Sequence, residues 1–96
     1  MTTTEFHSVE DVYAAARQVR DALLERGEKE AAAELDGTMR TFWTTASEAL
    51  GEMKLSLLKV RPTVERATGE TILSLLDAAV VGATKLFEGA RRIGSH

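Results

Sequence analysis

The stretch ILSLLDAAVVGATKLF, from Ile72 to Phe87, decides the fold class of this 96-residue chain. Its apolar residues recur every three or four positions, so that at about 100° per residue they cover one broad face of a helix. The stretch is shorter than the ~20 residues that span a bilayer, and it contains Asp77 and Lys85. We therefore predict an amphipathic helix over residues 70–92, whose apolar face packs into a protein core.

The N-terminal half shows the same periodicity twice. A first helix is predicted over residues 8–26, with Ser8 as its N-cap and Gly27 as its stop. A second is predicted over residues 28–42 because this segment is rich in strong helix formers. The apolar stripe of the second helix consists of Ala32, Leu35, Met39 and Phe42. A joint of one glycine implies that the two helices form an antiparallel hairpin.

A third helix is predicted over residues 45–61. Thr45 and Glu48 have the spacing of a capping box, in which the threonine hydroxyl accepts a backbone N–H of the first turn. Ala46 is expected at the centre of the buried stripe. Pro62 is expected to end the helix, because the residue before a proline avoids the helical region, and to open a further segment.

These elements predict an all-α fold, an antiparallel four-helix bundle that is dimeric. The short joints at Gly27, Thr44 and Pro62 place sequential helices side by side. The chain is expected to form one domain over residues 1–96, with flexible tails at 1–7 and 94–96. The predicted core includes Leu50, Met53, Leu57, Leu76 and Leu86.

Composition excludes several classes of protein. The chain has no cysteine, which excludes a disulfide scaffold and thiolate chemistry. Hydrophobic residues make up 44% and charged residues 28%, as in soluble globular domains. The net charge of -3 gives no general attraction to nucleic acid or to a membrane surface. Since the N-terminus lacks the pattern of a secretory signal, we expect a cytoplasmic protein.

Residues that could carry chemistry are few. His7 and His96 both lie outside the predicted helices, and neither has ligand spacing to another histidine or a carboxylate. Glu48 and Glu52 lie one helical turn apart, as in the carboxylate-bridged metal sites of bundles, but such sites also need histidines. The sequence predicts no catalytic residue, no cofactor and no metal. It predicts a protein that is not an enzyme.

Residues 29–48 weakly resemble a helix-turn-helix, since Ala33 and Gly37 have the small-residue and turn-glycine spacing of that motif. The recognition helix would then run from Thr38 to Thr45. The segment before it is rich in Asp and Glu, which repel phosphates, so a DNA-binding regulator is kept only as an alternative.

Some apolar residues lie outside the stripes that face a core, and they predict a protein interface. Leu55 projects away from the stripe of the third helix, and Trp43 lies at a helix joint. The predicted interface consists of Trp43, Leu55, Leu58, Leu73, Val80 and Phe87. A two-fold dimer would cover this surplus on both subunits at once. Alternatively, a fifth short helix at residues 62–67, or the N-terminal tail with Phe6, folds over it.

Residues 23–61 also resemble small bacterial helical proteins, most of them uncharacterised. Two patterns carry the resemblance. Leu23, Gly27, Ala32 and Leu35 match the first pattern, and Thr45, Ser47, Glu48, Leu50, Met53 and Leu57 match the second. The resemblance supports a helical hairpin and implies no activity. We therefore expect a non-enzymatic interaction or regulatory module, most simply a homodimer; immunity-type or antitoxin-type inhibitors also fit the size and acidity.

Overall fold

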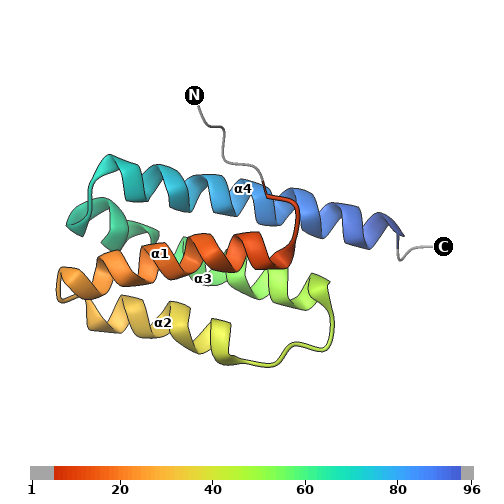
Figure 1. The fold of residues 1–96 in the computed structure, drawn as a ribbon, viewed down its shortest axis with the longest axis horizontal. Coiled ribbons are helices and arrows are strands. Elements are labelled where there is room, and N and C mark those ends of the chain that lie inside the picture. Colours follow the sequence, from red (N-terminus) through yellow and green to blue (C-terminus); the bar gives the residue numbers. More distant parts are fainter. Residues whose placement is uncertain (1–5, 94–96) are drawn as a thin grey trace.

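The chain folds into four helices and, within the described residues, no strands. The computed structural model describes residues 6–93, and side chains as far as residue 89. The helices are α1 (Val9–Glu25), α2 (Lys29–Arg40), α3 (Ala46–Ala67) and α4 (Glu70–Ile93). Figure 1 shows α4 along one side of the bundle, α2 along the other, and α1 in front of α3 between them. The prediction of an all-α helical bundle is confirmed.

Local sequence signals set the ends of α1 and the start of α3. The Ser8 hydroxyl accepts the backbone N–H of Asp11 at 3.4 Å, and the Thr45 hydroxyl accepts that of Glu48 at 3.1 Å, so both predicted N-caps are confirmed. After α1, Gly27 has a φ of 76°, which only glycine adopts without strain. The N–H groups of Gly27 and Glu28 donate to carbonyls of the last turn of α1, which turns the chain directly into α2.

The end predicted for the third helix is wrong, because α3 continues through Pro62 to Ala67. A proline inside a helix removes one hydrogen bond, the one to the carbonyl of Leu58, and crowds that carbonyl. Both Leu58 and Pro62 are exposed, so water can solvate the carbonyl. Val64, beyond the proline, is fully buried and holds the last turns against the core. Residues 62–67 are therefore part of α3 and not a fifth helix.

All four helices contribute side chains to the core. Its largest fully buried side chains are Leu23, Leu35, Leu50, Met53, Leu57, Leu76, Val12, Val19 and Val64. The predicted core positions Leu50, Met53, Leu57 and Leu76 are thus confirmed, whereas Leu86 is only partly buried. Ala46 was expected at the centre of a buried stripe but is exposed, since it begins α3 at the end of the bundle.

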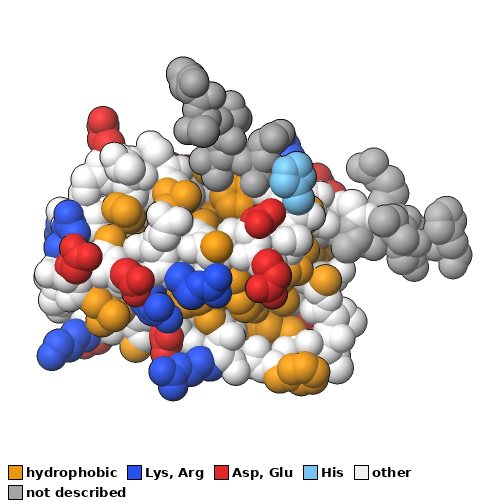
Figure 2. Space-filling model, viewed as in Figure 1, with side chains coloured by type: hydrophobic (Ala, Val, Ile, Leu, Met, Phe, Trp, Pro, Cys, Tyr) orange, Lys and Arg blue, Asp and Glu red, His pale blue; other side chains and the backbone are white. Residues whose placement is uncertain are grey.

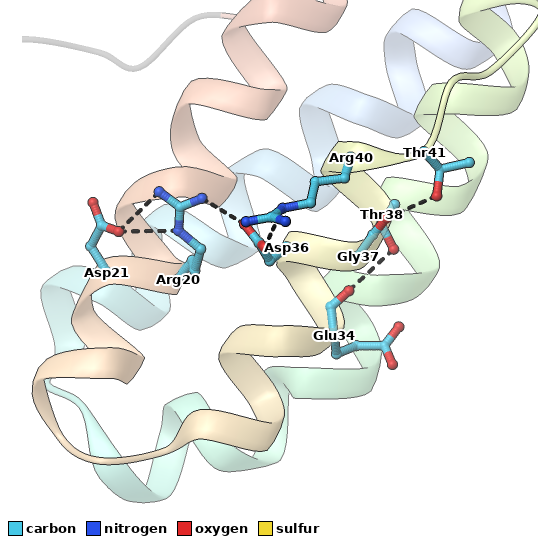
Figure 3. A network of polar contacts seen from close by, with 8 residues as sticks. All are labelled: Arg20, Asp21, Glu34, Asp36, Gly37, Thr38, Arg40 and Thr41. Atoms are coloured by element: carbon cyan, nitrogen blue, oxygen red, sulfur yellow. Dashed lines mark hydrogen bonds and ion pairs between the residues drawn. The ribbon is translucent and has the colours of Figure 1, made fainter.

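Ionic contacts connect neighbouring helices at the surface. Arg20 of α1 donates to the Asp36 carboxylate of α2 at 2.9 Å, and Arg40 binds the same carboxylate at 2.7 Å (Figure 3). Hydrogen bonding to Asp36 raises the pKa of Arg20. Between α3 and α4, Arg61 donates two parallel hydrogen bonds to Asp77, at 2.7 and 2.9 Å. Such paired geometry fixes the register of the two helices.

The residues before α1 also contact the bundle. The Phe6 ring is partly buried, and a Cβ atom on Gly82 of α4 would lie only 2.5 Å from it, so only glycine fits beneath the ring. The His7 backbone N–H donates to Asp11 at 2.8 Å. The rest of the expected tails, residues 1–5 and 94–96 with His96, lies outside the described residues.

The bundle is flat, with dimensions of 45 × 33 × 18 Å. Within the described residues α2 and α4 do not contact each other, whereas α1 contacts α3 between them. Consequently α1 and α3 each present one long side to solvent, on opposite faces of the molecule. Figure 2 shows the α1 face, where Lys and Arg side chains alternate with Asp and Glu among small hydrophobic patches.

Candidate interaction surface

Exposed large hydrophobic side chains gather around the α2–α3 hairpin. Phe42 in the connection is 90% exposed, and Leu55 and Leu58 of α3 are 59% and 42% exposed. In the part of the chain whose side chains the structure describes, two more are exposed, Leu24 on α1 and Val81 on α4. Single exposed hydrophobic residues are normal, but a group on one hairpin marks a candidate contact surface.

Four residues form what we call the outer face of α3: Gly51, Leu55, Leu58 and Pro62. Their spacings of four, three and four residues place them in one row along the helix. The row points away from the side of α3 that buries Met53, Val60 and Val64. The outer face therefore presents small and apolar groups to solvent over about three turns of the helix.

A depression lies beside this face, between α2 and α3, and has a volume of about 450 Å³. Leu55 and Trp43 provide apolar parts of its lining, and Ala33 and Gly37 of α2 keep it open because their side chains are small or absent. The indole Nε1 of Trp43 donates to the backbone carbonyl of Thr38 at 3.1 Å, which fixes the ring at the end of α2.

The floor of the depression consists of polar side chains that bind one another. Ser56, which is buried, donates to the Glu34 carboxylate at 3.2 Å and hydrogen-bonds the Thr38 hydroxyl. The other carboxylate oxygen of Glu34 binds the Lys59 ammonium at 3.3 Å. Within the part of the chain that the structure describes, every buried side-chain N or O atom has a hydrogen-bond partner. These groups hold α2 against α3.

The residues weighed for chemistry do not form a reactive group. Glu48 accepts a hydrogen bond from the Thr44 hydroxyl, while Glu52 lies at the edge of the depression. In the described residues, no three His, Asp or Glu side chains are placed to hold a metal ion. Burial raises the pKa of the Tyr13 phenol, an effect that the neighbouring Trp43 reduces and the charge of Glu10 increases. Tyr13 is not among the residues that line the depression.

The structure divides the six predicted interface residues into two groups. Leu55 and Leu58 belong to the outer face of α3, and Trp43 lines the depression beside it. Leu73, Val80 and Phe87 of α4 are partly buried and pack against the core. The Phe87 ring lies 3.6 Å from the position that a Cβ on Gly51 would occupy, so it borders the outer face from the side of α4.

Two expectations for the α2–α3 region are wrong. Phe42 was assigned to the apolar stripe of the second helix, but α2 ends at Arg40 and Phe42 is almost fully exposed. The recognition helix expected from Thr38 to Thr45 is not formed. Thr38 belongs to the last turns of α2, and residues 41–45 form a non-helical connection.

Two further findings concern membrane spans and known relatives. No helix among residues 6–93 combines the length and hydrophobicity needed to cross a membrane. The resemblance of residues 23–61 to small bacterial helical proteins stays an expectation. Compared with known protein families, with characterised proteins and with solved structures, the chain matches none.

Proposed function

We propose that this chain is a non-enzymatic interaction or regulatory module that binds a protein partner through the outer face of α3 and the adjoining α2–α3 connection. The observation that carries the proposal is the grouping of Phe42, Leu55 and Leu58, all exposed, on one hairpin. Each fully buried Leu or Phe side chain contributes about 1.5–3 kcal/mol, so covering this surface favours association.

The simplest partner is a second copy of the same chain. In a two-fold dimer the same surface of both chains forms the interface, so one apolar surface on each chain is sufficient. Phe87 and Trp43 border it on its two sides, as partly exposed aromatic residues do in protein interfaces.

Sedimentation equilibrium tests this proposal. We expect the wild-type chain to show twice its 10.5 kDa mass at micromolar loading. Leu55→Glu should reduce the mass to that of the monomer while the helical circular dichroism is retained. Val81→Glu is the matched control, because Val81 is similarly exposed, at 54%, but lies on α4. A mass near 10.5 kDa for the wild type at every loading would refute self-association.

A further inference from the structure

One side of the outer face of α3 carries charges of opposite sign at its two ends. Glu52 and Lys59 lie on the same side of the face, since at about 100° per residue their directions differ by only about 20°. Both are exposed, and both line the depression between α2 and α3. Glu52 precedes the centre of the apolar row and Lys59 follows it. On this side of the face, a second α3 running in the opposite direction would therefore place Glu52 near the partner's Lys59 and Lys59 near the partner's Glu52.

On this basis we infer that the partner is a second copy whose α3 packs antiparallel on the first, about a two-fold axis between Leu55 and Leu58. The inference rests on the proposed function. Leu55 then lies opposite the partner's Leu58, and Gly51 lies opposite the partner's Pro62. In an antiparallel pair, side chains on the same side of the face meet each other. Glu52 lies level with the partner's residue 61, so its distance from the partner's Lys59 along the helix axis is two residues, or about 3 Å. The symmetry forms this pair twice.

The groups already in the structure can accommodate the new pair. The Glu52 side-chain carboxylate has no hydrogen-bond or ion-pair partner among the described residues. Lys59 binds Glu34 from one side, but an ammonium group has three N–H donors and can bind a second carboxylate. On the opposite side of the face, Lys54 meets the partner's Arg61, whose charge Asp77 neutralises through two hydrogen bonds.

A parallel pair of α3 helices is disfavoured by the same charges. In parallel helix pairs, a residue on one side of the face meets the partner's residue five positions further on. Lys54 would then meet the partner's Lys59, and Glu52 would meet the partner's uncharged Ser47, so neither Glu52 nor Lys59 gains an ion pair. Arg61 would meet the partner's Arg66, but Asp77 and Glu28 already neutralise these two side chains. At each end of the antiparallel contact, Glu48 lies at the level of two charged residues of the partner. Glu65 has the same charge as Glu48, and Arg66 has the opposite charge.

The antiparallel arrangement also gives exposed Phe42 a position. The Thr38–Ser56 and Glu28–Arg66 contacts show that α2 runs antiparallel along α3. The two-fold axis therefore brings the connection of one chain level with the far end of the partner's α2–α3 groove. A second depression of about 460 Å³ lies there, and its lining consists of Gly27, Glu28, Lys29, Glu30, Ala31, Thr63 and Arg66. The arrangement therefore places Phe42 next to a mostly charged surface of the partner.

Charge exchange tests the arrangement. Glu52→Lys places two lysines together at each pair, and Lys59→Glu places two glutamates together. We expect each variant alone to dimerise roughly tenfold to a hundredfold more weakly than the wild type at low salt. An equimolar mixture should recover the wild-type affinity, because the mixed dimer matches Lys with Glu at both sites. The difference should shrink at high salt.

Controls separate the arrangement from its alternatives. Glu25→Lys and Lys85→Glu make the same charge changes on α1 and α4, and their mixture should show no selective pairing. Thermal unfolding of Lys59→Glu checks that loss of the Glu34 bridge leaves the chain folded. Because the chain has no cysteine, a single spin label at Glu65→Cys reports direction: about 25 Å or more between labels in the antiparallel dimer, and under about 15 Å in a parallel one.

Each outcome decides one question. Recovery in the mixture together with the long label distance supports the antiparallel pair. If Leu55→Glu dissociates the dimer but the charge variants still dimerise normally, or their mixture fails to recover, the antiparallel arrangement is overturned and self-association stands. If the wild type is monomeric at all loadings, both the antiparallel pair and self-association are refuted.

Discussion

Replacing Gly82 by alanine gives a sharp test of the packing of Phe6 on α4. The new Cβ would lie 2.5 and 2.6 Å from two ring carbons of Phe6, too close for any contact, so the ring must leave its place. Phe6 is partly buried, and losing about half of its burial costs about 1 kcal/mol. Alanine in place of a mid-helix glycine stabilises by about 0.8–1 kcal/mol. The two effects should nearly cancel.

The cancellation disappears when the ring is absent. In a Phe6→Ala background, Gly82→Ala keeps the helix-forming gain and causes no collision, so it should stabilise by about 1 kcal/mol. Urea unfolding of the wild type, the two single variants and the double variant, followed by circular dichroism, measures the coupling between the two positions. We expect a coupling free energy of about 1 kcal/mol. If Gly82→Ala stabilises equally in both backgrounds, Phe6 does not lie on Gly82.

Three further variants test the core, a cap and an ion pair. Leu76→Ala should destabilise the fold by about 2–5 kcal/mol in urea unfolding, because Leu76 is fully buried; a change below ~0.5 kcal/mol would mean that this face of α4 is misassigned. Thr45→Ala removes the hydroxyl that caps α3 and should cost about 1 kcal/mol, whereas Thr45→Ser should cost less. The hydrogen bonds from Arg61 lower the pKa of Asp77 below 3.8, so the stability that this carboxylate contributes is present above pH 3.8 and is lost as the pH falls through its folded pKa. Asp77→Asn should therefore show a shallower loss of stability in acid than the wild type, and an unchanged acid profile would contradict this role.

The sequence predicts α1 and α4 to within one residue at each end because their signals are local. Ser8 accepts a hydrogen bond from its own helix, and Gly27 supplies a backbone angle that other residues avoid. Pro62 misleads for the opposite reason. The cost of a proline in a helix is local, but it is offset by contacts with other elements: Val64 in the core and Arg61 on Asp77. The spacing of residues along the chain does not reveal those contacts.

The candidate surface is predictable only in part, for the same reason. The exposure of Leu55 follows from the helical phase of α3 and is confirmed. Phe42 keeps the apolar spacing of α2 but lies beyond its end, because the backbone at Thr41 is already extended, with φ of -71° and ψ of 136°. The depression next to Trp43 depends on how α2 rests on α3 through Glu34 and Ser56. No local pattern encodes that contact.

Because α2 packs on the bundle through few buried side chains, its motion should differ from that of the other helices. Only Ala32 and Leu35 of this helix are buried, its first turn has no side-chain cap, and within the described residues it does not contact α4. Hydrogen exchange at its amides should therefore proceed through partial openings that leave the other three helices folded, and protection should be lowest in this helix. Of the two helices that line the groove, α3 should stay folded while α2 opens. A partner that binds in the groove should therefore slow hydrogen exchange in α2 more than in any other helix.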